Sequence, residues 1–211
     1  MPGNEDSPRP RRMLSKGRME GISDGVFGFA ITLLVLDLAL RPPGTPLEQV
    51  LHAWPSYLAY LISFLTIGGA WLAHTGLTDQ LERTDPVLLR LNLLGLLAVT
   101  FLPFPTRLTA EALHNTSGER VFVTMYGLTL LAIRLLGAAL DAYARREHLY
   151  SAHQADEELH RDRRNLLPVV IGYVIAILIG LAVPVLAMAV YLGLAVYLVV
   201  PFRDRRAPTP D

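Results

Sequence analysis

Three polar side chains that could carry chemistry occur within otherwise apolar stretches of the chain. Asp24 lies near the start of one long apolar segment, His74 near the end of the next, and Asn92 near the start of a third. A carboxylate, an imidazole and an amide can hydrogen-bond to one another, exchange a proton or bind a cation. Because ionisable side chains are costly inside a membrane, they mark functional positions wherever their segments span one.

The apolar segments are long enough to span a membrane. Of the 211 residues, 52% are hydrophobic, and the block from Leu166 to Phe202 contains no charged side chain. A spanning helix needs about 20 apolar residues, so this block is long enough for two. In water it would expose more apolar surface than a domain of this size can bury. We therefore predict an all-α membrane protein.

Hydropathy predicts six spans, separated by charged, proline or turn-forming residues. Asp85-Pro86 is typical of a helix start, with an N-cap followed by proline at the first helical position. The last two spans divide near Pro184, which implies a tight hairpin. The predicted spans are Ile22–Leu40, Ala53–Thr78, a run from Asp85 to Pro103-Phe104-Pro105, Val121–Leu140, Leu166–Val183 and Val185–Val200.

The basic residues predict that both termini are cytoplasmic. Six spans place the termini on one side of the membrane, and the cytoplasmic side is the one rich in lysine and arginine. The side opposite the termini has only Arg41, Arg107 and Arg120, while Arg134 lies within a span. The segments on the side of the termini contain Arg9, Arg11, Arg12, Lys16, Arg18, Arg83, Arg90, Arg145, Arg146, Arg161, Arg163, Arg164, Arg203, Arg205 and Arg206.

The domain organisation follows from this topology. We predict a disordered basic arm at residues 1–17, too polar for a signal peptide, and a six-helix membrane domain at 18–202. That domain includes a cytoplasmic connection at about 142–165, and a cytoplasmic tail follows at 203–211. The net charge of zero gives no basis for a nucleic-acid partner, and the absence of cysteine excludes disulfides, thiol catalysis and thiolate metal sites.

Polar groups from the first three spans meet in the cytoplasmic third of the membrane in this topology, where they can satisfy one another. The predicted interhelical network comprises Arg18, Ser23, Asp24, Trp71, His74 and Asn92. Simpler explanations remain open. Ser23-Asp24 could be a plain N-cap, and His74 could bond to a backbone carbonyl. Arg134 is interpreted as a snorkelling or structurally paired arginine, and Asp141 as interfacial.

The first span also has a stripe of side chains along one face. At about 100° per residue, this face collects Gly25, Phe29, Thr32, Leu33 and Leu36, while Asp24 falls on the opposite side. One face could therefore line a pathway while the other anchors the helix. Any packed helix has such a face, so the stripe alone does not establish a pore.

The segment Arg18-Met-Glu-Gly-Ile22-Ser23-Asp24, which leads into Gly25-Val-Phe-Gly-Phe-Ala-Ile-Thr32, resembles the opening helix of the transmembrane protein 175 family. This family comprises endolysosomal potassium channels and their bacterial relatives. Trp71-Leu-Ala-His74 resembles its second-helix motif, and the run from Asn92 to Pro103-Phe-Pro105-Thr resembles its third helix. The chain has one repeat, as bacterial members do, and is similar to that branch.

The resemblance implies a homotetramer of six-helix subunits in the cell inner (plasma) membrane, with one copy of the first helix per subunit around a central pore. The implied function is passive conduction of potassium and related monovalent cations, without enzyme activity, without a cofactor and without a Thr-Val-Gly-Tyr-Gly filter. Carried over by position, the constriction would be formed by Phe29, Leu33 and Leu36, with Thr32 as a hydroxyl layer. The network residues would hold the pore helix in place.

The chain departs from the family pattern at two positions. Ile22 stands where the signature has phenylalanine, so an apolar group is kept but its packing changes. Phe29 stands where isoleucine or leucine is usual, and a ring of phenylalanine side chains could either narrow the constriction or tilt aside.

Two other classes of function were weighed against the channel. A proton- or ion-coupled secondary transporter could use Asp24 and His74, but such carriers often have inverted repeats and broken helices, and neither is found here. The spacing Glu157-Glu-Leu-His160 resembles half of a di-metal site, but it occurs once in a charge-rich segment. We therefore predict no metal site.

Overall fold

The computed structural model describes residues 16–36, 38, 45–115, 118–151 and 159–200, with backbone alone at 115 and 159–165. Most of the predicted basic arm, the predicted tail, Arg41 and Glu157 lie outside these residues. The described residues form eight helices and no strand. The helices are α1 (Lys16–Val35), α2 (Pro46–His52), α3 (Trp54–Asp79), α4 (Pro86–Phe101), α5 (Pro103–Asn115), α6 (Glu119–Arg146), α7 (Leu159–Ala182) and α8 (Pro184–Val199).

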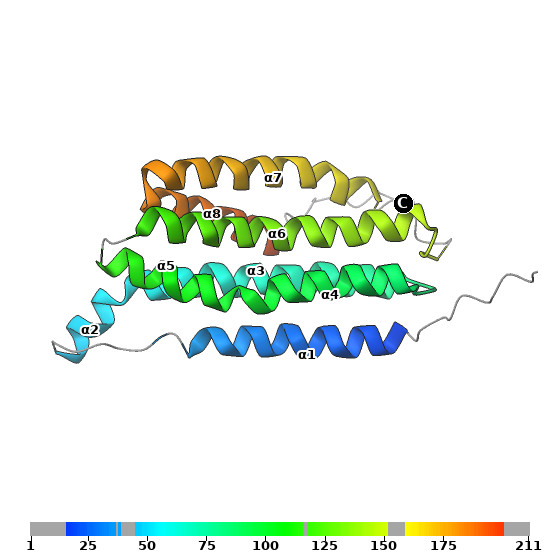
Figure 1. Cartoon of the computed structure of the whole chain (residues 1–211), viewed down its shortest axis with the longest axis horizontal. Helices are drawn as coiled ribbons and strands as arrows, with labels where there is room; N and C mark the ends of the chain where they lie inside the picture. The colour runs from blue at the N-terminus through cyan, green and yellow to red at the C-terminus, as the bar shows by residue number, and fades with distance from the viewer. Residues whose placement is uncertain (1–15, 37, 39–44, 116–117, 152–158, 201–211) are drawn as a thin grey trace, which may run out of the picture.

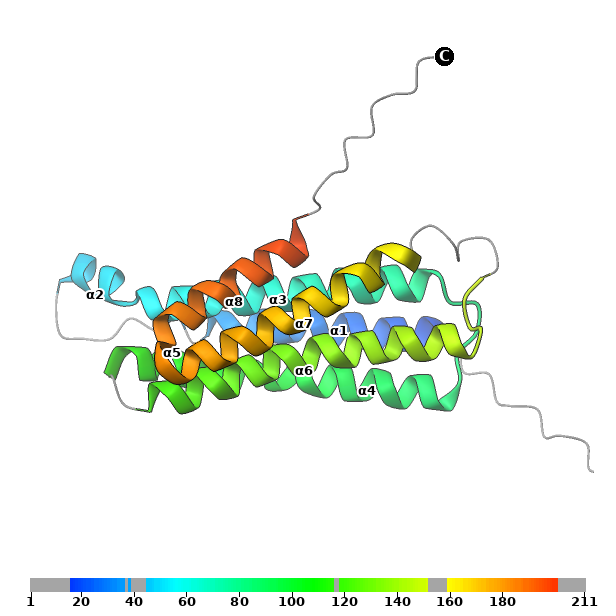
Figure 2. The same ribbon diagram turned by 90° about the horizontal axis from the view of Figure 1, so that it is seen from above.

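The helices form a bundle with one long axis, and α1 lies along one edge of it (Figure 1). The hairpin of α7 and α8 covers the side of the bundle away from α1 (Figures 1 and 2). Because α4 and α5 together form one span and α2 is short, the bundle has the six long elements that the sequence predicts. The protein is an all-α membrane protein, as predicted.

Three helical segments of the described residues are long and apolar enough to cross a membrane: α3, Pro86–His114 and α6. The apolar parts of α7 and α8 are shorter, at Leu166–Ala182 and Pro184–Val199. Helix α1 spans 20 residues, but its first half carries Lys16, Arg18, Glu20 and Asp24. Its apolar character is therefore concentrated in the second half.

The capping prediction at Asp85 is confirmed, but the predicted end of the third span is wrong. The carboxylate of Asp85 accepts a hydrogen bond of 2.7 Å from the backbone N–H of Leu88. The helical path then continues past Pro103, because Leu102 keeps right-handed helical dihedral angles and α5 runs on to Asn115. Proline in the first turn of α5 removes only N–H groups that lack a partner there.

The last apolar block divides at Pro184, as predicted, but α7 begins at Leu159 rather than Leu166. The cytoplasmic connection predicted at about 142–165 is therefore partly helical, since α6 ends at Arg146 and α7 begins before Leu166. Charged residues that the hydropathy pattern assigns to a connection thus continue the helix beyond its apolar part.

The core of the bundle contains polar groups that satisfy one another. The Ser63 hydroxyl lies 2.7 Å from the Tyr126 hydroxyl and 2.8 Å from that of Thr106, which joins α3, α5 and α6. The Tyr126 ring also packs edge-on against Tyr191 of α8, with ring centroids 5.9 Å apart. Buried polar groups are tolerated in apolar surroundings only when they are hydrogen-bonded, so this cluster fixes which faces of the helices meet.

Close packing around Tyr191 depends on Gly127. A Cβ atom at Gly127 would overlap the phenol of Tyr191 and lie 2.8 Å from Ile177 Cγ1. Gly137 lies ten residues further along the same helix, and a Cβ atom there would meet no atom within 4 Å. The two glycines of α6 therefore have different roles, and only Gly127 is required for close helix packing.

We expect Gly127→Ala to destabilise the protein by about 1–3 kcal/mol, because the added methyl group forces α6 away from α7 and α8. Gly137→Ala is the matched control and should be neutral or slightly stabilising, since alanine favours helix and space is open there. Thermal unfolding of both purified variants in one detergent measures the difference. Equal melting temperatures for the two variants would contradict the close packing at Gly127.

Candidate functional site

One face of α1 anchors it to the bundle. Its buried residues follow one another at intervals of four, four, three and four positions, which places them on a single face. This face packs against α3 and α4. The buried residues are Met19, Ser23, Phe27, Ala30 and Leu34.

A hydrogen bond between Ser23 and Asn92 joins α1 to α4 within this face. The amide of Asn92 donates to the Ser23 hydroxyl at 3.0 Å, and that hydroxyl donates to the carbonyl of Met19 at 2.8 Å. Ser23 is fully buried and Asn92 is 4% exposed. If α1 turned about its axis, Ser23 would keep its bond to Met19, but the buried amide of Asn92 would lose this acceptor, which is costly in an apolar environment.

A second hydrogen bond joins α1 to α3 at the subunit surface. The indole N–H of Trp71 donates to the Asp24 carboxylate at 2.9 Å. Both residues are exposed, Trp71 by 39%. Because α1 begins at Lys16, Ser23 and Asp24 lie inside the helix. The alternative explanation of this pair as an N-cap is therefore wrong.

His74 packs against α1 through its ring. Its centroid lies 5.6 Å from that of Phe27, with the rings tilted by 43°. The Nε2 atom of His74 is buried and forms no hydrogen bond with any residue that the structure describes. The structure therefore brings His74 to the back of α1 without giving that nitrogen a partner.

Arg18 is the one predicted network residue that stands apart. It is exposed at the start of α1, and within the described residues no hydrogen bond or ion pair joins it to the other predicted members. The remaining residues form three contacts between helices: Ser23 with Asn92, Asp24 with Trp71, and His74 with Phe27.

The predicted pore stripe faces away from its own subunit. Phe29 is 63% exposed, Leu36 is 71% exposed, Thr32 is also exposed, and Leu33 is partly buried. Since α1 lies at the edge of the bundle, none of the other described helices covers this face (Figure 1). The Thr32 hydroxyl donates to the carbonyl of Phe29 at 2.8 Å, which leaves the lone pairs of its oxygen available.

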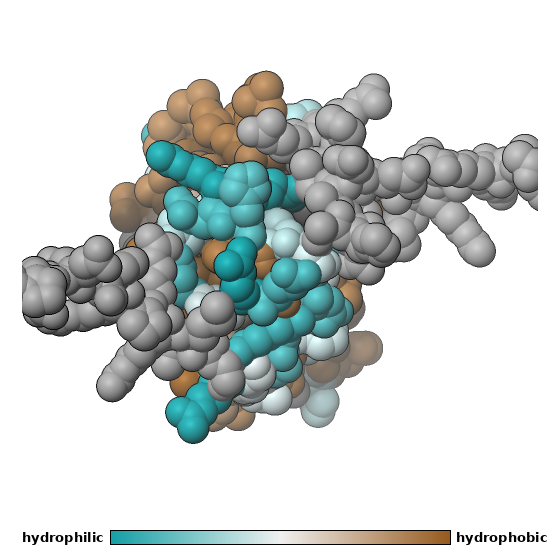
Figure 3. All heavy atoms as spheres, turned by 90° about the vertical axis from the view of Figure 1, so that its right-hand side faces the viewer, coloured by the Kyte–Doolittle hydropathy of each residue, from teal (hydrophilic) through white to brown (hydrophobic). Residues whose placement is uncertain are grey.

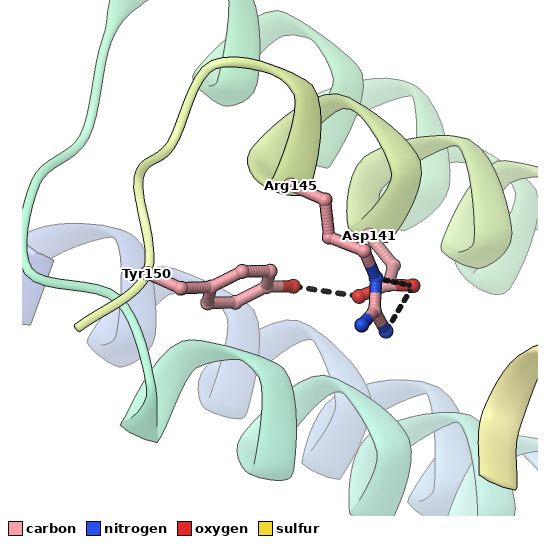
Figure 4. A network of polar contacts seen from close by, with 3 residues as sticks. All are labelled: Asp141, Arg145 and Tyr150. Carbon is pink, nitrogen blue, oxygen red and sulfur yellow. Dashed lines mark hydrogen bonds and ion pairs between the residues drawn. The ribbon is translucent and has the colours of Figure 1, made fainter. Parts of the chain in front are cut away.

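The structure also contains a polar cluster that the sequence interpretation missed. The Asp141 carboxylate accepts bonds from Arg145 Nε at 2.9 Å and Arg145 Nη2 at 2.7 Å, and a third from the Tyr150 hydroxyl at 2.7 Å (Figure 4). The spacing of four residues between Asp141 and Arg145 is typical of a helical ion pair and could have indicated it. The approach of Tyr150 depends on the turn after α6, where His148 has a φ of 50°.

No group of three or more metal-ligating side chains gathers anywhere in the described ranges. The side chain of His160 and all of Glu157 lie outside what the structure describes. The arrangement around α1 is thus a helix with one anchored face and one free face, and its polar contacts hold the helix rather than a cofactor.

Comparisons with known proteins show which family the chain resembles. The family described as "Endosomal/lysosomal potassium channel TMEM175" matches residues 18–103, which include α3, α4 and all but the first two residues of α1. A protein named potassium channel from Streptomyces collinus is 34% identical over 206 residues, covering 93% of this chain and 100% of that protein. Another of that name, from Chamaesiphon minutus, is 40% identical over 146 residues, covering 66% and 71%.

The fold has a counterpart among solved structures. The crystal structure of a lysosomal potassium-selective channel TMEM175 homolog from Chamaesiphon minutus superposes with a TM-score of 0.74 at 33% identity, covering 87% of this chain and 95% of that one. Sequence similarity to a relative over its full length, a match to the family model over residues 18–103 and a shared fold all point the same way. The chain belongs to the TMEM175 family.

Proposed function

We propose that this chain forms a homotetrameric, potassium-permeable channel in the cell inner membrane, with the exposed face of α1 lining the pore. The observation that carries this proposal is the exposure of Phe29, Thr32 and Leu36 on a helix whose opposite face is anchored. A single subunit offers one such helix, so a closed pathway needs symmetric assembly of several copies. Potassium is proposed as the permeant ion because similar bacterial proteins are named potassium channels.

The side chains on this face suit a pore without a carbonyl filter. Bulky apolar groups such as Phe29 and Leu36 can form a constriction that excludes water when narrow. Thr32 lies between them, and its hydroxyl hydrogen is already donated to the carbonyl of Phe29. Its oxygen can therefore turn toward a cation as an acceptor, replacing part of the hydration shell.

The contacts behind α1 would set the rotation of the pore helix. The bond between Ser23 and Asn92 holds the buried face of α1 against α4. The bond between Asp24 and Trp71 holds α1 against α3 at the surface of the bundle. In this proposal neither pair touches the ion, so they govern whether the pore forms rather than which ion it prefers. The excess of basic residues on the side of the termini supports a topology with both termini in the cytoplasm and with these contacts near the inner surface.

A proton- or ion-coupled carrier is not favoured. A carrier must alternate its access, whereas α1 runs without a break from Lys16 to Val35. The solved relative and the similar bacterial proteins are channels by name. Enzyme activity is likewise not part of the proposal, because the family is one of ion channels.

Recordings from the purified protein in planar bilayers, with opposed potassium and sodium gradients, test the function. We expect a current without any added energy source, with a reversal potential displaced toward the potassium equilibrium value. Empty bilayers and heat-treated protein serve as controls. If no current appears, but vesicles containing the protein accumulate a solute against an ion or proton gradient, the channel proposal fails and a carrier takes its place.

We expect Phe29→Ala to raise single-channel conductance or leak current several-fold, because a ring of phenylalanine side chains is removed from the constriction. Val121→Ala is the control: this residue is also an exposed apolar side chain, but it lies on α6. Single-channel recording measures both. A pore that Phe29→Ala leaves unaltered would remove Phe29 from the constriction.

We expect Trp71→Phe to lower the fraction of assembled protein and the total current while leaving the potassium-to-sodium preference unchanged. The substitution removes the hydrogen bond to Asp24 and keeps an aromatic ring, a loss of about 1–2 kcal/mol per subunit. The only other tryptophan gives a matched control, Trp54→Phe, at the opposite end of α3. Size-exclusion chromatography and bilayer recording give the two readouts.

Ser23→Ala and His74→Ala extend this test to the buried contacts. Both should weaken assembly or current without changing ion preference. Normal assembly and normal current in all three variants would contradict the role proposed for the contacts behind α1. A changed ion preference would instead place these residues in the permeation pathway.

A further inference from the structure

A large cavity lies behind α1, on the side away from the exposed stripe. Its volume is about 990 Å³, and it lies between α3, α4, α6, α7 and α8. Gly76, Gly95 and Gly137, from three different helices, line it, and a Cβ atom at any of them would meet no atom within 4 Å. The space is therefore open at these glycines rather than filled by neighbouring side chains.

The end of the bundle next to the cavity is polar. Arg145, Arg146 and Gln80 line the cavity there. In the view onto this end, hydrophilic residues dominate and hydrophobic ones are visible between them (Figure 3). Water and dissolved ions can therefore approach the cavity from this end.

Arg134 lines the same cavity much deeper in the bundle. It lies twelve positions before Arg146 on α6, which is about 18 Å along the helix axis. Its Nε atom is buried and forms no hydrogen bond with any residue that the structure describes. The residue as a whole is only partly buried and lines the cavity, so a group that enters the cavity can reach its charge.

No carboxylate in the described part of the chain forms an ion pair with Arg134. The nearest candidate on its own helix face is Asp141, seven positions on and about 10 Å away along the axis. The carboxylate of Asp141 already accepts three hydrogen bonds, two from Arg145 and one from Tyr150 (Figure 4). Among the described residues, Arg145 is therefore compensated by a carboxylate and the deeper Arg134 is not.

We infer that each subunit binds a small anion at Arg134, at the deep end of the glycine-lined cavity. A guanidinium fork recognises carboxylate or phosphate oxygens through paired N–H groups and also attracts halides. The apolar neighbours Leu130 and Ile133 line the same region and lower the local dielectric constant, which strengthens the attraction. The polar opening favours an anion taken from water over the head group of a lipid.

The proposed anion site is distinct from the proposed pore. Phe27, on the buried face of α1, and His74 of α3 line the cavity. Phe29 and Leu36 lie on the exposed side of α1 instead. The inference concerns the interior of one subunit and does not rest on the channel proposal. It can be tested on purified protein without measuring any current.

The test is thermal unfolding of the full-length protein, titrated with bromide and separately with inorganic phosphate. Each variant is titrated over the same range of ionic strength, so that the general effect of salt is common to all of them. We expect a saturable rise in melting temperature for the wild type, and an apparent affinity at least about tenfold weaker for Arg134→Gln. Arg134→Lys should keep the response to bromide and lose more of the response to phosphate. Arg120→Gln, an exposed arginine of the same helix, should behave as the wild type.

Two further measurements make the outcome decisive. Bromide-soaked crystals should show an anomalous peak beside Arg134. Gly95→Leu, which should fill the cavity while keeping the arginine, should abolish the saturable response even if Arg134→Gln fails to fold. Mass spectrometry of the purified protein separates the sources. A fatty acid or lipid phosphate that co-purifies with wild type and not with Arg134→Gln would identify a head group as the anion. A response to bromide and phosphate that survives both Arg134→Gln and Gly95→Leu would overturn the site.

Discussion

The hydrogen bond between Ser23 and Asn92 is the contact on which the arrangement of α1 depends. Both groups are buried in apolar surroundings, and the Asn92 amide would lose its acceptor if α1 turned about its axis. Apolar packing alone would not fix the rotation, because neighbouring apolar faces of a helix can exchange at little cost. The single polar contact makes one rotation preferable to the others and thereby decides which residues of α1 are left free.

The rest of the bundle supports this contact at a distance. Ser63, Thr106 and Tyr126 join α3, α5 and α6 by hydrogen bonds, so α3 is held by the core on one side and holds α1 on the other. Gly127 lets α6 approach Tyr191 closely, which ties the hairpin of α7 and α8 to the same core. Helix α1 is thus a peripheral element on a rigid support.

The sequence predicts the helices and most contacts of α1, because apolar length and polar residues inside spans are local signals. It does not predict the start of α1, since charged residues can continue a helix beyond its apolar part. Nor does it predict that Arg18 makes no contact with the other network residues or that His74 Nε2 has no partner among the described residues, because those depend on side-chain direction. The link from Tyr150 to Asp141 depends on the turn at His148 and could not be read from spacing.

The free face of α1 has a consequence for how such a protein can change over evolution. Phe29 and Leu36 make few contacts within their own subunit, so replacing them barely affects the folding of the monomer. Selection can therefore act on these positions almost independently of the core. In a symmetric assembly each substitution is repeated in every copy, so small changes in sequence become large changes in the shared surface. Substitutions at Phe29 are therefore ones that this separation would allow.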